Sequence, residues 1–276
     1  MTTIIGIDAE WQANPKYEQN DVLSYQWFGL DGGREWSGVH YPEDDKRLTI
    51  SEWLSLALME GYKNRAWPRT VVLASHFTTA ELSTVKDFHT LKTRLDLVQG
   101  SSYASARQPF TTNCYDNSRN RHPVTVHLLD TMLLAPADGR SLAALGELLG
   151  FPKEELPKGH TKDQMRRFMD EEPELFQTYA LRDAEITARY IRRVEEECSG
   201  LGLDNYRPVT VGGLAVRIFI RKPEENGQSY YSIMGIEQRS AREGRGRRSF
   251  TSNTRVYQNR LAERQSSDRV LRSVFS

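Results

Sequence analysis

The sequence predicts one mixed α/β domain of about 200 residues, followed by a shorter segment of different character. Apolar runs of strand type fill the first forty residues, strand and helix patterns alternate in the middle, and helical spacing dominates residues 141–200. This order of elements is typical of one sheet covered by helices. The 276-residue length is sufficient for a full hydrophobic core.

Composition indicates a globular protein. Apolar residues make up 38% of the chain and charged residues 27%. The sequence contains neither a run of eighteen apolar residues nor an apolar leader, so we expect no membrane association and no secretion. Cys114 and Cys198 offer neither a disulfide framework nor a paired metal-binding spacing, which favours a reducing, cytoplasmic compartment.

Charge is distributed unevenly along a chain whose net charge is zero. From Glu237 onward there are ten arginines and four acids, a net charge of +6, so residues 1–236 carry −6. An acidic body with a basic tail fits a protein that gathers carboxylates around cations and touches a polyanion elsewhere. An acidic enzyme with a disordered tail fits this distribution equally well.

The first part of the chain predicts three antiparallel strands. Their runs are residues 2–11, 22–30 and 34–41, and Asp31-Gly32-Gly33 predicts a hairpin turn between the last two. A helix over residues 49–64, with Ser51 as N-cap, comes next, and a strand over residues 70–75 follows it. We then expect a helix from Thr78 or Thr79 to residue 88. A loop over residues 100–121 leads to a strand that ends at Asp130.

Three helices are predicted next. The first covers residues 141–150, with Ser141 as N-cap and Gly150 as the stop. The second covers residues 161–169. The third covers residues 173–198, with Pro173 in its first turn and Gly200 after its end. Residues 203–236 read as a connector in which 210–220 and 229–236 each predict a strand. Residues 237–276 lack the apolar side chains needed to offset ordering entropy, so we expect a flexible basic tail.

Two carboxylates end the first strand. Asp8 and Glu10 are two residues apart and therefore share one face of the strand. Adjacent like charges are unfavourable unless a cation lies between them. The pair therefore suggests a metal site, although solvated strand ends often carry such pairs.

A third carboxylate lies on the buried face of the long helix. Asp183 falls on the apolar stripe, one turn after Tyr179. A buried carboxylate needs a partner, which is either a metal ion or an arginine such as Arg182 or Arg140. In mid-chain, His76 follows a buried strand and Glu81 opens a helix; taken singly, these two read as a core histidine and an acid favoured by the helix dipole.

Together, the D-x-E pair, the acid that opens a mid-chain helix and the late Y-x-x-x-D resemble the DEDD superfamily of 3′→5′ exonucleases in its tyrosine-bearing branch. That branch includes polymerase proofreading domains and ribonuclease D type enzymes. The stretches LLDTMLL, SLAALGELLGFPKEELP and LFQTYALRDAEITARYI also look like this family. The resemblance covers roughly residues 3–200 and is closest to the exonuclease domains of family-B-like phage or plasmid polymerases.

The resemblance implies an RNase-H-like fold and two divalent ions, Mg²⁺ or Mn²⁺, which suit an all-carboxylate site. It implies that Asp8, Glu10 and Asp183 hold the ion that activates water, and that Asp8 and Glu81 serve the second ion. Tyr179 would align the attacking water with the terminal phosphodiester, and nucleoside 5′-monophosphates would leave one at a time.

The sequence departs from the family pattern at two places. The family's second motif has Asp where this chain has Glu81, and Asn where it has Phe77; Asp87 is the fallback ligand. Trp11 stands where related polymerases often place a small hydroxyl residue. It either stacks on the terminal base or lies in the core beneath the sheet edge. With Trp11, we assign His76 and Phe77 to substrate binding.

Several polar residues have both structural and binding interpretations. Asp130-Thr131 reads as a structural turn cap. Two groups are candidates for contacts with the nucleic-acid backbone or, alternatively, for solvated loop positions: Lys153, Lys158 and His160, and Arg107, Arg119 and Arg121.

The predicted function is that of a proofreading-type exonuclease on single-stranded DNA 3′ ends, within a split or truncated polymerase whose polymerase region would begin near residues 203–236. A ribonuclease D-like exoribonuclease would need the same residues, so RNA stays open as substrate. An inactive nucleic-acid-binding module is the third reading, with Glu81 as its sign. No polymerase metal motif, G-x-S-x-G or phosphate-binding G-x-x-x-x-G-K-[ST] loop occurs.

Overall fold

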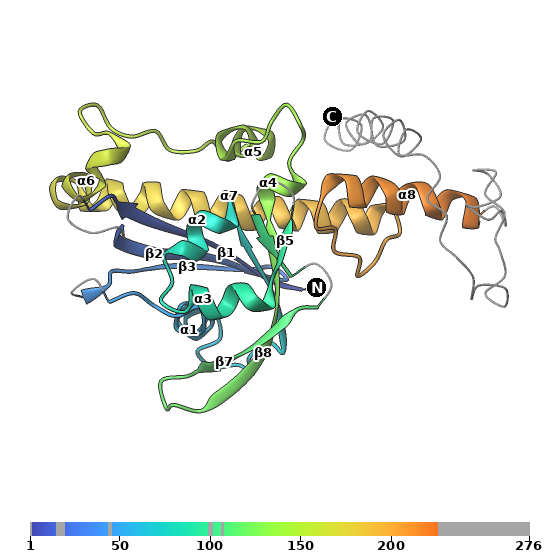
Figure 1. Cartoon of the computed structure of the whole chain (residues 1–276), viewed down its shortest axis with the longest axis horizontal. Coiled ribbons are helices and arrows are strands. Elements are labelled where there is room, and N and C mark those ends of the chain that lie inside the picture. Colours follow the sequence, from blue (N-terminus) through green and yellow to red (C-terminus); the bar gives the residue numbers. More distant parts are fainter. Residues whose placement is uncertain (1, 15–19, 44–45, 99–101, 106–107, 226–276) are drawn as a thin grey trace, which may run out of the picture.

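A six-stranded mixed sheet forms the centre of the molecule (Figure 1). The computed structural model describes residues 2–14, 20–43, 46–98, 102–105 and 108–225, and side chains up to residue 219. The strands lie in the order β3-β2-β1-β4-β8-β7. Their bounds are Thr3–Gln12 (β1), Asp21–Asp31 (β2), Arg34–His40 (β3), Thr70–Ser75 (β4), Phe110–Tyr115 (β7) and Arg121–Asp130 (β8).

Strand directions divide the sheet into two parts. β1, β2 and β3 form an antiparallel meander, whereas β4 and β8 run parallel to β1, and β7 pairs with β8 in antiparallel fashion. The parallel pairing places the carboxyl ends of β1, β4 and β8 at one edge of the sheet. A separate two-stranded sheet consists of β5 (Asp96–Val98) and β6 (Ser102–Ala104).

Helices cover both faces of the large sheet (Figure 1). α7 packs on β1 and β2 on one face, and α1 packs on β2, β3 and β7 on the other. The helices are α1 (Ile50–Gly61), α2 (Thr78–Ser83), α3 (Phe88–Leu91), α4 (Thr131–Leu134), α5 (Leu142–Leu149), α6 (Met165–Glu171), α7 (Pro173–Gly200) and α8 (Val211–Glu225), with 3₁₀ turns η2 (Lys92–Arg94) and η3 (Lys162–Gln164).

The alternation of side chains along β1 builds two cores. Ile5 and Ile7 point into the core beneath α1, whereas Ile4 belongs to the core beneath α7. The α/β class with a mixed sheet flanked by helices is therefore confirmed, and it is compatible with an RNase-H-like fold. Within the residues described, no helix combines the length and apolar character needed to cross a bilayer.

Most predicted turns and caps are confirmed. Gly32 and Gly33 form the hairpin turn, Ser141 caps α5, Gly150 ends it in the left-handed conformation, and Pro173 begins α7. α7 runs through Gly200 itself.

The N-cap predicted for α1 is wrong. Thr49 caps this helix, because its hydroxyl accepts from the Glu52 amide while the Glu52 carboxylate accepts from the Thr49 amide. Ser51 lies inside the helix, and its hydroxyl donates to the carbonyl of Asn113.

The loop predicted over residues 100–121 is also wrong, because β6 and β7 fall within it. β7 is an edge strand whose outward positions are polar, which hides the strand pattern. Its inward side chains Phe110 and Cys114 are buried and do show the period of two.

The strand predicted over residues 210–220 is a helix, α8. Leu214 and Ile218 are four residues apart and pack into the core that contains the end of α7, so a helical period suits this stretch better. The strand predicted over 229–236 and the basic tail over 237–276 lie outside the described residues.

Gly6 lies where α7 crosses β1 most closely. A Cβ atom built at this position would be 2.2 Å from the Ala184 carbonyl oxygen and 2.8 Å from the Ala188 amide nitrogen. Any larger residue would therefore push α7 away from the sheet. Gly6 is two residues before Asp8, on the same face of β1.

We expect Gly6→Ala to lower the free energy of unfolding by about 1–3 kcal/mol, because the added methyl group overpacks a backbone contact. Gly33→Ala is the matched control, since a Cβ atom there meets nothing within 4 Å. Urea unfolding of both variants measures the difference. Equal stability of the two would contradict a close α7–β1 contact.

Candidate active site

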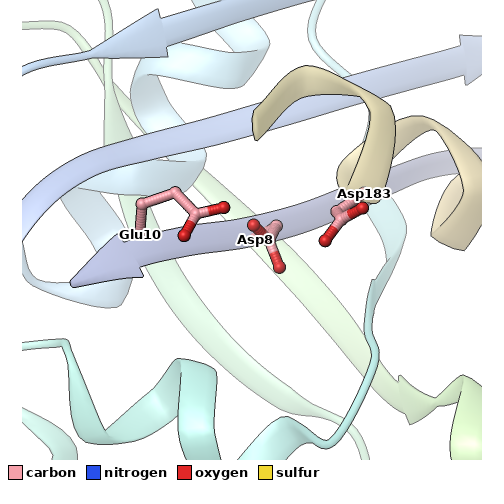
Figure 2. Close-up of side chains that lie close together, drawn as sticks. All are labelled: Asp8, Glu10 and Asp183. Carbon is pink, nitrogen blue, oxygen red and sulfur yellow. The ribbon is translucent and has the colours of Figure 1, made fainter. Parts of the chain in front are cut away.

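Three carboxylates from distant parts of the chain converge at the end of β1 (Figure 2). Asp8 and Glu10 project from β1, and Asp183 projects from α7. Each offers a carboxylate oxygen, and these oxygens lie within 4.8 Å of one another. The shared face predicted for Asp8 and Glu10 and the inward position predicted for Asp183 are therefore confirmed.

The strand geometry changes directly after this pair. Asp8 lies opposite Gln26 of β2 and Glu10 opposite Ser24, and the β1–β2 register then shifts between Glu10 and Trp11. Such an irregularity re-aims the side chains that follow it. Trp11 is 36% exposed, so the alternative of a core tryptophan is wrong. Its stacking on a substrate base stays a prediction.

Two fully buried polar residues of β2 hold Asp8. The Gln26 Nε2 donates to Asp8 Oδ2 at 2.6 Å, and the Ser24 hydroxyl donates to Gln26 Oε1 at 3.1 Å. These two hydrogen bonds in series fix the orientation of the Asp8 carboxylate. Sequence reasoning missed both residues; the signal was their polarity inside an otherwise apolar strand.

Glu81 reaches the same group of acids from the first turn of α2. Its side chain is buried, and burial followed by the charges of Asp8 and Glu10 raises its pKa well above the ordinary value, while a hydrogen bond from the Ala9 backbone opposes the rise. Asp87, the predicted fallback, is wrong, because its carboxylate accepts from the Ile50 amide at the start of α1.

The site concentrates negative charge in a poorly hydrated place. Burial, and then the charge of Asp183, raises the pKa of Asp8 from 3.8 to about 7, against the opposing effects of Lys153 and Gln26. Burial also raises the pKa of Glu10 and of Asp183, and nearby acids add to the rise at Glu10. Repulsion among these groups makes the site a strong attractor for cations.

Two buried carboxylate oxygens have no hydrogen-bond partner among the described residues: Asp183 Oδ1 and Glu81 Oε2. Buried acceptors without partners are costly, and a cation would satisfy them. The four acids offer only oxygen ligands, which are the ligands of Mg²⁺ and Mn²⁺. The residues present therefore fit a divalent metal site.

Lys153 brings a positive charge into contact with the acids. Its ammonium group pairs with Asp183 Oδ2 and lies 4.9 Å from the centre of the Tyr179 ring. Burial opposes its charge, but Asp183 and Tyr179 raise the net pKa above the ordinary value, so Lys153 stays charged. The solvated-loop interpretation of Lys153 is therefore wrong, as is the alternative in which Asp183 pairs with Arg182 or Arg140.

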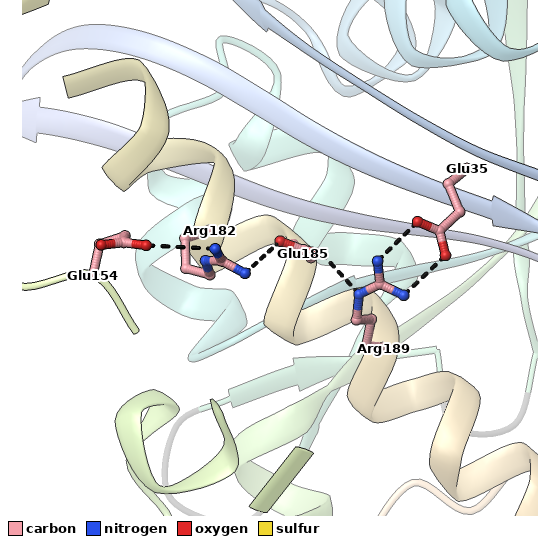
Figure 3. A network of polar contacts seen from close by, with 5 residues as sticks. All are labelled: Glu35, Glu154, Arg182, Glu185 and Arg189. Carbon is pink, nitrogen blue, oxygen red and sulfur yellow. Dashed lines mark hydrogen bonds and ion pairs between the residues drawn. The ribbon is translucent and has the colours of Figure 1, made fainter. Parts of the chain in front are cut away.

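An ion-pair network on α7 holds the segment that carries Lys153 (Figure 3). Arg182 pairs with Glu154 and Glu185, and Arg189 pairs with Glu185 and, through both terminal nitrogens, with Glu35 of β3.

Phe151 anchors the other side of this segment. Its ring lies over the Arg189 guanidinium at 4.4 Å. Lys153 is thus flanked by two residues that contact arginines of α7.

Tyr179 precedes Asp183 by one helical turn and points to the same face. Burial raises its pKa to about 12, so the phenol keeps its proton at neutral pH. Its ring packs edge-on against Phe168 at 6.0 Å. These contacts fix the ring beside the carboxylates and leave a hydroxyl that can donate a hydrogen bond.

The turn after β4 adds two residues from the predicted substrate-binding set. Phe77 has φ of 62° and is 40% exposed, an unusual conformation that is often found at functional sites. Its amide donates to Asp130, which also accepts from the amides of Thr78 and Met132. The structural role predicted for Asp130 is confirmed.

His76 lies behind this turn, with Nδ1 2.9 Å from the Thr131 hydroxyl, and burial lowers its pKa. His160 is hydrogen-bonded within the protein, with its Nε2 3.0 Å from Glu172 Oε1. Substrate contacts of His76 and Phe77 stay predictions.

Metal-free protein should lose stability as pH rises from about 4 to about 7. The folded-state pKa of Asp8 lies above its ordinary value, so the folded protein binds extra protons in this window and releases them at higher pH. Asp8→Asn, which cannot ionise, should therefore exceed the wild type in Tm at pH 8 with chelator, with a smaller gap at pH 5. Adding Mn²⁺ at pH 8 should stabilise the wild type. A Tm gap that is independent of pH would contradict the raised pKa.

Comparison with known proteins relates the chain to a polymerase. It is 32% identical over 257 residues to the primer-independent DNA polymerase PolB of Escherichia coli, a match that covers 85% of this chain and 30% of PolB. The chain thus corresponds to less than a third of the length of this curated relative. No protein-family model matches the chain.

Among solved structures, the phi29 DNA polymerase in complex with primer-template DNA is similar with a TM-score of 0.42 and 9% identity, covering 82% of this chain and 36% of phi29 polymerase. Its likeness is too distant to carry inference. The sequence match to PolB therefore marks the chain as polymerase-related.

Proposed function

We propose that the protein is a two-metal 3′→5′ exonuclease that removes nucleoside 5′-monophosphates from DNA 3′ ends. The observation that carries this proposal is the convergence of Asp8, Glu10, Glu81 and Asp183 beside Tyr179. Similarity to a DNA polymerase supports DNA as the substrate. Such a site beside a polymerase suits proofreading.

The carboxylates are the proposed metal ligands. Asp8, Glu10 and Asp183 would hold one ion, and Asp8 with Glu81 would serve the second. When bound, the ions supply water activation and stabilisation of the leaving oxygen. Glu81 retains the carboxylate of the Asp usual in the family, it interacts electrostatically with Asp8 and Glu10, and one of its buried oxygens has no partner among the described residues, which a cation would satisfy.

Tyr179 and Lys153 have distinct proposed roles. The protonated phenol of Tyr179 orients the attacking water by a hydrogen bond. The Lys153 ammonium, which stays charged beside Asp183, offsets the negative charge of the phosphodiester as it enters the acidic site. Exposed Trp11 and Phe77 offer aromatic faces for terminal bases, with His76 behind the turn that presents Phe77.

The wider context is also part of the proposal. We assign the chain, which matches 30% of PolB, to the exonuclease part of a polymerase, with a polymerase domain or subunit as partner. We also assign it to the reducing cytoplasm. Residues 203–236 would connect to the polymerase region. Within them, the structure describes α8, which packs against the end of α7.

Digestion of single strands tests the activity. We expect 5′-labelled DNA to give a ladder from the 3′ end in Mg²⁺ or Mn²⁺ and none in chelator. Asp8→Ala should abolish the ladder and still fold, because it removes a buried charge. Cleavage of matched RNA alone would favour the exoribonuclease instead. Absence of cleavage in both metals by folded wild type would favour an inactive binding module.

Substitutions at Glu81 and Tyr179 separate charge from shape. We expect Glu81→Gln to lower kcat/KM by about 10–100-fold through weaker metal support, and Glu81→Asp to retain most of the activity. Tyr179→Phe should cost about 100-fold in kcat with KM little changed, because the water loses its orienting hydroxyl. As a control, the activity of each variant is measured as a function of Mn²⁺ concentration, so that weaker metal support is distinguished from loss of the orienting hydroxyl. Unchanged activity in Glu81→Gln would remove Glu81 from the site.

A further inference from the structure

A hollow lies at the opposite end of the sheet from the carboxylates. Its volume is about 860 Å³, within the range of small-molecule sites. Its lining residues come from the end of α1, the segment that leads into β4, and the β7–β8 hairpin. This hairpin extends away from the rest of the sheet (Figure 1). Its charged and aromatic lining residues include Lys63, Arg65, Trp67, Arg69, Asp116 and His122.

Strand directions separate this hollow from the acidic site. Arg69 immediately precedes β4, whereas His76 and Glu81 follow it at the acidic end. Six residues of extended strand span about 20 Å. The hollow is therefore a distinct site.

Positive charge in the hollow is not neutralised by the protein. Arg65 and Arg69 are exposed, and neither has a carboxylate within ion-pair distance in the part of the chain that the structure describes. Lys63 pairs with Glu60 at 3.0 Å. Two guanidinium groups thus remain available for an anion, and their planar donor sets suit phosphate oxygens.

The acid in the hollow, Asp116, is already surrounded by donors. Its carboxylate accepts from the amides of Ser118 and Asn120 and from the Asn120 side chain, and it lies 3.1 Å from His122 Nε2. Hydrogen bonds from Asn120 and His122 lower the pKa of Asp116 to about 2. Asp116 therefore shapes the hairpin turn and holds His122 in place, and its charge is screened by these donors.

An aromatic platform lies beside the arginines. The rings of Trp67 and His122 are stacked, with centroids 4.4 Å apart and planes inclined by 22°. Both side chains are only partly buried, so this stacked pair contributes part of its surface to the lining of a cationic hollow. A site that recognises a nucleotide commonly combines an aromatic side chain, which contacts the base, with a basic group, which contacts the phosphate.

We propose that this hollow binds a nucleotide unit, with the base against the Trp67–His122 pair and the phosphate on Arg65 and Arg69. The unit is either a free nucleotide or part of a DNA strand. This inference does not depend on hydrolysis at the carboxylates, since binding is measured with chelator present.

Anisotropy of a 5′-labelled twelve-residue oligothymidylate in chelator tests the proposal. We expect Arg65→Gln/Arg69→Gln to raise Kd at least tenfold and to make the slope of log K against log salt shallower by about 1.4, the value for two phosphate contacts with a single strand. The matched control is Lys86→Gln/Arg94→Gln, which removes two exposed charges outside the hollow and should bind like the wild type. A Kd and salt slope equal in the two double variants would overturn the proposal.

Trp67→Leu tests the base contact separately. We expect weaker oligonucleotide binding in this variant, with its fold checked by urea unfolding. Wild-type binding by folded Trp67→Leu would overturn the nucleotide assignment, because only phosphate contacts would remain. Competition by thymidine 5′-monophosphate that is lost in the arginine double variant would identify a free-nucleotide site. Failure of the mononucleotide to compete, with the arginine effect intact, would identify a strand-binding site.

Discussion

The close contact of α7 with β1 at Gly6 is the constraint on which the site depends. The absence of a side chain at Gly6 lets the backbone of α7 lie directly on the strand at Ala184 and Ala188. Asp183 adjoins this contact on α7, and Asp8 follows it by two residues on β1. The carboxylates therefore meet because two backbones meet, and a site of this precision rests on rigid elements.

The same contact creates an electrostatic problem that the surrounding residues only partly relieve. Four acids with raised pKa values lie together, and two of their oxygens have no partner among the described residues. Gln26 holds Asp8, and Lys153 pairs with Asp183. Charge repulsion and unpaired acceptors that the protein leaves unrelieved are characteristic of a site that is completed by a ligand, here a cation.

The arginine network of α7 connects this local chemistry to the fold. Arg182 and Arg189 contact Glu154 and Phe151, so the segment that delivers Lys153 is held by the helix that delivers Asp183 and Tyr179. The pairing of Arg189 with Glu35 extends the same network to β3. One long helix thereby positions Asp183, Tyr179 and, through its arginines, Lys153, while the aromatic and basic hollow is formed separately by the α1–β4 connection and the β7–β8 hairpin.

By itself, the sequence determined the α/β class, the strands that carry Asp8 and Glu10, and the amphipathic helix that carries Asp183, because these follow from local periodicity and caps. It did not reveal β6, β7 or the helical state of α8, since edge strands and short peripheral helices depend on the partners against which they pack. Lys153 and Gln26 were also placed only by the tertiary structure. Their roles arise from contacts between residues that are distant in the chain, and no local pattern records which buried charge a side chain will meet.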